Sequence, residues 1–159
     1  MAVTSLQEAI SAQADINRFL ARSGIKDLVG DYGELLAQEA LGGHRKNAVN
    51  RGFDIQHPEL GRVEVKTRKY ELLQDGTVRK ESRAVGFAGK ESSFDWLAHV
   101  VLDTDFSVVG ACLVSYHDVW PEILRTTGKV GFPTSSRLPS SKNVTEMFRE
   151  AQLKLGFNI

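Results

Sequence analysis

The stretch of sequence that decides the fold is FDIQHPELGRVEVKT, residues 53–67. Its two ends alternate apolar and polar residues, and its centre, residues 57–61, is rich in turn-forming types, so the stretch predicts a β-hairpin. Side chains alternate between the two faces of a strand, so Glu64 and Lys66 share one face. Asp54 lies on the neighbouring strand, where packing alone would not require a carboxylate.

The carboxylates of this hairpin could hold a metal ion. Glu64 and Lys66 start about 7 Å apart, which leaves room for an ion and a nucleophilic water side by side. Asp54 and Glu64 repel each other unless a cation lies between them. Two such carboxylates, a main-chain carbonyl and waters suit Mg²⁺, and Glu34 is a third carboxylate that could approach the same edge. The alternative is structural: Asp54 caps a turn, Glu64 pairs with Lys66 across an exposed face, and Glu34 is solvated.

Two helices are expected before the hairpin. Residues 5–22 begin with a Ser5–Glu8 capping box, and their apolar face consists of Leu6, Ala9, Ile10, Ile16 and Leu20. Residues 26–41 predict the second helix, which Gly42-Gly43 would end. Gly30 and Gly33 lie inside it at a cost of about 1 kcal/mol each relative to Ala. They therefore indicate either close packing or a later helix start.

Strands and two further helices are expected after the hairpin. Residues 68–92 are polar and basic, with a second, exposed hairpin turning at 75–76. Residues 96–102 and 107–116 are apolar enough for central strands. Asp118 is expected to cap a short helix with Pro121 in its first turn, and residues 129–142 are expected to form a loop. A final helix over 143–155 would have an apolar face of Val144, Met147, Phe148, Ala151 and Leu155.

This order of elements predicts one mixed α/β (α+β) domain over residues 1–159, with a central mixed sheet of four to five strands flanked by helices. The length suits a single core, and no apolar run approaches the roughly 18–20 residues that span a bilayer. No signal peptide is visible. Because Cys112 is the single cysteine, an internal disulfide and a multi-cysteine zinc site are excluded, and a reducing, cytoplasmic location is expected.

The sequence lacks the motifs of several well-known classes of enzyme and metal site. The phosphate-binding loop pattern fails around Gly89-Lys90, and neither a Gly-x-Ser-x-Gly elbow nor a dinucleotide fingerprint occurs. The four histidines, at positions 44, 57, 99 and 117, share no metal-ligand spacing. His99 lies in an apolar strand and is expected to be a core residue.

Charge is unevenly distributed although it cancels overall. Residues 44–90 carry 11 basic and 6 acidic side chains, residues 91–122 carry no basic and 6 acidic ones, and residues 123–159 carry 6 basic and 2 acidic ones. Two basic stretches separated by an acidic one are compatible with a nucleic-acid partner. Chance clustering on a solvated surface is the alternative.

The candidate residues occur in a familiar order. Gly30-Asp31-Tyr32-Gly33-Glu34 on a helix, Gly52-Phe53-Asp54-Ile55, and Val63-Glu64-Val65-Lys66-Thr67-Arg68 follow one another along the chain. Together they resemble the PD-(D/E)xK nuclease superfamily, which has the restriction-endonuclease-like fold. The resemblance covers about residues 26–128. It implies a metal-dependent endonuclease that hydrolyses phosphodiester bonds in DNA, and a homodimer.

The resemblance also implies roles for individual residues. Asp54 and Glu64 would ligate Mg²⁺ or Mn²⁺, and the main-chain carbonyl of Val65 would complete the protein ligands. Lys66 would orient or deprotonate the attacking water and offset charge on the phosphorane. Glu34 would bind a second metal ion directly or through water. A metal held by carboxylates supplies both a nucleophile at neutral pH and electrostatic relief, as phosphodiester hydrolysis requires.

The basic residues after this motif would then contact the phosphate backbone, which gives affinity without sequence specificity. They are Arg68, Lys69, Arg79, Lys80, Arg83 and Lys90, with Lys129, Arg137 and Lys142 in the later loop. An ordinary solvated loop is the alternative reading of these charges. Two other functions compete with the nuclease: a non-catalytic nucleic-acid-binding or assembly module that keeps the fold, and a small-molecule or protein-interaction domain. An RNA substrate is left open, because the scissile chemistry is the same.

Overall fold

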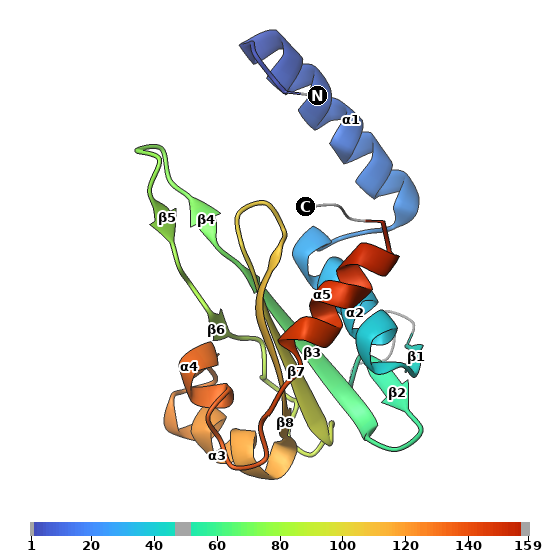
Figure 1. The fold of residues 1–159 in the computed structure, drawn as a ribbon, viewed down its shortest axis with the longest axis vertical. Coiled ribbons are helices and arrows are strands. Elements are labelled where there is room, and N and C mark those ends of the chain that lie inside the picture. The colour runs from blue at the N-terminus through green and yellow to red at the C-terminus, as the bar shows by residue number, and fades with distance from the viewer. Residues whose placement is uncertain (1, 47–51, 157–159) are drawn as a thin grey trace.

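The computed structural model describes residues 2–46 and 52–156 and is built around one mixed sheet. Six strands lie in the order β1-β2-β3-β7-β8-β10 (Figure 1). Their bounds are His44–Arg45, Ile55–His57, Gly61–Lys69, Trp96–Leu102, Val108–Ser115 and Lys142–Asn143. Strands β3 and β7 are parallel, whereas the other neighbours are antiparallel. The mixed α/β class is confirmed.

The expected number of four to five strands was wrong, because the described sheet has six. The hairpin of β2 and β3 and the apolar strands β7 and β8 form where the sequence predicts them. The edge strands β1 and β10 have two residues each. Two residues are too few to show a period of two, so the pattern that marks a strand is missing from them.

Helices cover both faces of the sheet (Figure 1). On one face, α2 (Leu28–Leu41) and α5 (Thr145–Lys154) pack over Val63 and Val65 of β3 and over alternate residues of β7 and β8. On the other, α3 (Tyr116–Arg125) packs with the segment that contains Phe87 and Phe94, and α4 (Phe132–Ser135) contacts β7. Because side chains alternate along a strand, Glu64 and Lys66 point toward the second face.

The first helix forms as expected but contributes nothing to the core. Helix α1 (Leu6–Ser23) begins at the Ser5–Glu8 capping box. None of its residues is buried, and Leu6 and Ile10 are 77% and 63% exposed. The helix projects away from the sheet (Figure 1). The periodic pattern identified an apolar face correctly, but this face is not covered by the rest of the chain that the structure describes.

The second half of the chain differs from expectation in three places. Helix α3 is capped by Ser115 rather than Asp118, so Pro121 lies inside it and not in its first turn. The expected loop over 129–142 contains β9 (Val130–Gly131), α4 and the start of β10. In α5, Phe148 and Ala151 are buried as expected, but Met147 is 45% exposed.

Two other predictions are confirmed. The exposed hairpin is formed by β4 (Glu71–Leu72) and β5 (Val78–Arg79), and it leads into β6 (Arg83–Ala84), which pairs with β9. His99 is fully buried and bonds through Nδ1 to Ser135 Oγ at 2.8 Å. Burial lowers the pKa of His99 to about 4, so the ring is neutral at physiological pH. Within residues 2–46 and 52–156, the helices lack the combination of length and apolar character that a bilayer crossing needs.

Gly33 explains how closely α2 approaches β3. A Cβ atom built on Gly33 would lie 1.7 Å from Oγ1 and 2.8 Å from Cβ of Thr67. Only a residue without a side chain fits there, so of the two expectations for this glycine, close packing is the correct one. Gly30 differs, because its nearest neighbour is the carboxylate end of the exposed Asp27 side chain.

We predict that Gly33→Ala lowers the free energy of unfolding by about 1–3 kcal/mol, because the new methyl group overpacks the α2–β3 contact. Gly30→Ala is the matched control on the same helix. It should leave the free energy of unfolding unchanged or raise it by up to about 1 kcal/mol, because Asp27 can rotate away and Ala favours helix. Urea denaturation of the two variants measures both values. Equal effects would contradict the steric explanation.

Candidate active site

The candidate site lies beside Ile55, the first residue of β2, where the pairing of β2 with β3 stops and one edge of β3 is left open. Strand β2 pairs with residues 61–63 of β3, and β7 pairs with residues 63–69 along the opposite edge. Beyond Val63, the first edge is therefore free of a partner strand among the described elements. A cleft of about 290 Å³ opens there between α2, β3 and the segment after β6, and it is lined in part by Glu34, Asp54, Glu64 and Lys66.

Glu64 is the most buried charged residue of the site, at 1% exposure. Its Oε1 lies 2.8 Å from Nζ of Lys66, and its Oε2 lies 2.9 Å from Nζ of Lys90. The ammonium of Lys66 also lies 5.4 Å from the centroid of the Phe87 ring. The pairing of Glu64 with Lys66 matches the structural alternative, but the exposed face which that reading assumed is in fact buried.

Asp54 is held by the backbone of the open edge. Its Oδ2 accepts a hydrogen bond of 2.7 Å from the backbone N–H of Val65. The N–H and C=O of one strand residue point to the same side, so the carbonyl of Val65 also faces this edge. Burial, followed by the charge of Glu64, raises the pKa of Asp54 to about 7; Glu34 adds to the increase, whereas the Val65 hydrogen bond and Lys90 oppose it.

Glu34 reaches the cleft from α2. It follows Gly30 by one helical turn, and both residues line the cleft. Arg45 of β1 binds Oε2 of Glu34 at 3.0 Å and Oδ1 of Asp31 at 3.3 Å. Arg45 was not predicted as a site residue, and a lone arginine after a glycine pair gives no signal in the sequence.

The site brings together the four residues expected to be catalytic, but not as a formed metal centre. Across the part of the chain that the structure describes, no group of three or more His, Cys, Asp or Glu residues is placed to hold an ion. Lysines occupy both oxygens of Glu64, and Arg45 occupies one of Glu34. The donors themselves are the hard oxygens that Mg²⁺ prefers. Burial is the first cause of the raised pKa of Asp54 and the charge of Glu64 the second, so a cation beside the two carboxylates would favour their charged forms.

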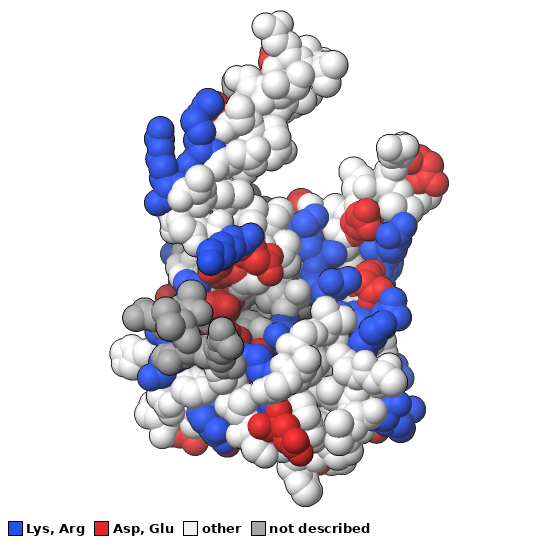
Figure 2. Space-filling view, turned by 180° about the vertical axis from the view of Figure 1, so that it is seen from behind, with Lys and Arg blue, Asp and Glu red and all other residues white. Residues whose placement is uncertain are grey.

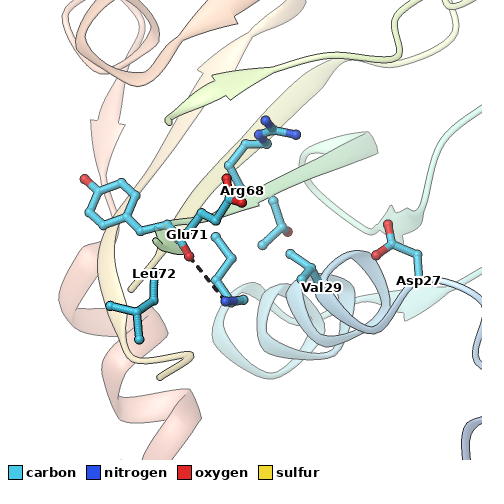
Figure 3. Close-up of a pocket in the computed structure, with 8 residues that line it drawn as sticks. Asp27, Val29, Arg68, Glu71 and Leu72 are labelled. Atoms are coloured by element: carbon cyan, nitrogen blue, oxygen red, sulfur yellow. Dashed lines mark hydrogen bonds between the residues drawn. The ribbon is translucent and has the colours of Figure 1, made fainter. Parts of the chain in front are cut away.

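A second cleft continues from the first along β3. It has a volume of about 570 Å³ and is lined by Asp27, Val29 and residues 67–72 (Figure 3). Asp27, Thr67 and Arg68 line both clefts. In Figure 3 the side chain of Arg68 extends to the side of β3 opposite Val29. Arg68 therefore lies at the junction of the two clefts, on the face of β3 that carries Glu64.

The other basic residues expected to bind nucleic acid are distributed differently. On the β4–β5 hairpin, Arg79 pairs with Glu71 at 2.9 Å, and just beyond it Arg83 pairs with Glu81 at 2.6 Å. Basic and acidic side chains accordingly lie side by side on this hairpin (Figure 2). Lys69 donates to the carbonyl of Tyr70 at 3.2 Å. Lys90, expected on a phosphate-binding surface, instead pairs with Glu64 inside the cleft.

We predict that Asp54→Asn stabilises the fold at pH 8 and not at pH 4. The pKa of Asp54 in the folded protein, about 7, lies above the ordinary value of 3.8. The contribution of Asp54 to the free energy of unfolding is therefore complete below pH 4 and is lost as pH rises through 7. Asn never ionises and avoids that loss, which at about 1.36 kcal/mol per pKa unit amounts to about 2–4 kcal/mol. Urea denaturation at both pH values measures the gain.

Asp15→Asn, on the exposed surface of α1, is the control and should show no such pH dependence. A gain for Asp54→Asn that is equal at pH 4 and pH 8 would contradict a buried, proton-binding carboxyl at this position.

Comparison with known proteins gives no assignment: no family model matches the chain, and no curated protein matches it.

Proposed function

We propose that the chain is a metal-dependent endonuclease that hydrolyses phosphodiester bonds in DNA and has a restriction-endonuclease-like core of the PD-(D/E)xK type. The observation that carries this proposal is the convergence of Asp54, Glu64 and Lys66 in one cleft at the open edge of β3. Burial and the charge of Glu64 raise the pKa of Asp54 to about 7, so this carboxyl group gains or loses a proton near neutral pH. Such a group is typical of functional sites.

Asp54, Glu64 and the carbonyl of Val65 would hold Mg²⁺ or Mn²⁺, and Glu34 would hold a second ion directly or through water. Such an ion supplies Lewis-acid stabilisation of phosphate charge and lowers the pKa of water. Lys66 keeps its ammonium 2.8 Å from Glu64, where it can orient the attacking water and offset the charge that develops on the phosphate. The burial of Glu64 strengthens these interactions, because the local dielectric is low.

The two connected clefts provide a path for a nucleic-acid backbone past the site. Arg68 lies at their junction, with Lys69 beside it on β3. The exposed pair of Arg79 with Glu71 contributes little stability on average, so Arg79 can exchange a carboxylate for a phosphate. Arg83 is held more firmly, because it binds both carboxylate oxygens of the half-buried Glu81. Lys80 lies between the two arginines on the chain. Such contacts are independent of base sequence.

A non-catalytic nucleic-acid-binding module is the second candidate, and one observation favours it. Lys90 occupies the Glu64 oxygen that Lys66 leaves free, so the carboxylates are neutralised without a metal ion. In that case the clefts would bind nucleic acid and leave it intact.

We also propose a homodimer whose α1 helices pair. Helix α1 exposes Leu6, Ile10 and Ile16 of its apolar face, and an isolated helix of this length is marginally stable in water. An apolar groove of about 530 Å³ continues this surface at the base of α1. Glu8 lies in the first turn and Arg22 in the last, so antiparallel pairing would bring opposite charges together. The free, buried thiol of Cys112 fits the proposed cytoplasmic location.

We predict metal-dependent cleavage of DNA that disappears in two variants. Wild type with Mg²⁺ or Mn²⁺ should cut at least one substrate in a panel of supercoiled plasmid, linear duplex, single strand, branched DNA and RNA. Asp54→Ala and Lys66→Ala should each reduce the rate by about 100-fold or more, because each removes charge stabilisation from the reacting phosphate.

Glu150→Ala and Lys154→Ala, which remove the same charges from α5, are the matched controls and should cut like wild type. Circular dichroism checks the fold of every variant. Salt-sensitive binding of uncut DNA by wild type would support the binding module instead. Cleavage of RNA alone would correct the substrate class.

We predict that wild type sediments with about twice the monomer mass of 17.6 kDa. Ile10→Asp should give monomers, because it places a charge in the apolar contact. Ser11→Asp, one residue along on the opposite side of the helix, should leave the dimer intact. Analytical ultracentrifugation measures the three masses. A monomeric wild type, or equal dissociation of both variants, would contradict pairing through α1.

A further inference from the structure

Lys90 occupies a position suited to a cation. Its Nζ lies 2.9 Å from Oε2 of Glu64 and 3.5 Å from the carbonyl oxygen of Gly52. Lys90 and Asp54 also line the same cleft. Carboxylate and carbonyl oxygens therefore surround this ammonium, and such oxygens are the ligands that a hard divalent cation takes.

The backbone of Lys90 is fixed while its side chain is long and flexible. Its N–H donates to the carbonyl of Phe87 at 3.0 Å, and its own carbonyl accepts from Ser93 N–H at 3.0 Å and from Ser93 Oγ at 2.7 Å. These bonds anchor a turn between β6 and β7. The ammonium is thus tethered, and it can leave Glu64 by rotation of the side chain with no movement of the turn.

We propose that Lys90 is a built-in competitor of the metal ion: it neutralises Glu64 when no metal ion is bound and must leave Glu64 when a divalent cation binds. The proposal rests on the metal site of the proposed function. A buried carboxylate without a partner is strongly unfavourable, so the 1% exposed Glu64 needs ammonium partners when no metal ion is bound. Once an ion lies between Asp54 and Glu64, an ammonium on the same oxygen would be repelled by it.

Of the two lysines that pair with Glu64, Lys90 is the one that moves, because it comes from a different segment of the chain whereas Lys66 lies on the same strand as Glu64. Lys66 lies on β3, two residues from Glu64 on the same face, and pairs with Oε1. Lys90 reaches Oε2 from a separate segment, and it lines the same cleft as Asp54, where the ion would bind. Displacement of Lys90 leaves the Glu64–Lys66 pair intact.

The displaced ammonium would acquire a second role. Lys90 and Arg68 line the same cleft, so a lysine released from Glu64 becomes available to a phosphate group of the substrate. Metal binding would then come first and increase the affinity of the cleft for the nucleic-acid backbone. The Lys90–Glu64 pair would then no longer favour the binding module over the nuclease. It would be the metal-free state of the proposed nuclease.

Calorimetric titration of the full chain with Mn²⁺ tests the competition without any substrate. Lys90→Met keeps the length of the side chain and removes the charge, so it should bind Mn²⁺ at least tenfold more tightly than wild type. Lys90→Arg should bind no more tightly than wild type. Lys154→Met, which removes the same charge from α5, should stay within twofold of wild type, and Asp54→Asn should abolish the binding that belongs to the site.

Amine labelling of wild type is the second measurement and needs no variant. Acetylation followed by mass spectrometry of peptides should show Lys90 several-fold more reactive with Mn²⁺ than without it, while the exposed Lys154 is unchanged. Unchanged labelling of Lys90 on metal binding would overturn the proposal even if Lys90→Met did not fold.

The outcomes separate this proposal from the proposed function. Equal or weaker Mn²⁺ binding by Lys90→Met, with binding that depends on Asp54, would overturn the competition and leave the metal site standing. Binding by Lys90→Met where wild type binds none would support the competition most strongly. An absence of Asp54-dependent binding in every protein would overturn both.

Discussion

The need to pair one buried carboxylate, that of Glu64, shapes the candidate site. At 1% exposure this side chain requires cations within reach, and β3 and the turn before β7 each provide a lysine. The ion pair of Lys90 with Glu64 links that turn to the strand, and the ammonium of Lys66 lies 5.4 Å from the centroid of the Phe87 ring. Asp54 is likewise buried and lies near the negative charge of Glu64, and these two causes raise its pKa.

The open edge of β3 complements this buried charge. Because β2 stops opposite residue 63, the next backbone groups of β3 face a side chain and solvent and not another strand. The N–H of Val65 is used by Asp54, and the adjacent carbonyl faces the same cleft. A longer β2 would have satisfied these groups and closed the cleft. The site thus depends on where a strand ends as much as on which residues it contains.

The sequence was informative where regular alternation or strong apolar character determines structure. It located the hairpin, the central strands, the exposed β4–β5 turn and the convergence of Asp54, Glu64 and Lys66. It could not locate two-residue edge strands, which are too short for any period. It could not show what covers the apolar face of α1, because periodicity describes one helix and not its surroundings. Lys90 is 26 residues from Glu64, and only the tertiary fold brings them together.

The contact between Gly33 and Thr67 has a consequence for how the protein tolerates change. Gly33 carries no chemistry, yet it sets how near α2 approaches β3, and the next residue along α2 is Glu34, which must reach the cleft. A saturation library selected for activity would therefore retain glycine at position 33 as strictly as the carboxylates. Intolerance of substitution there would reflect spacing between two elements, so a sensitive position in this chain is not by itself a reactive one.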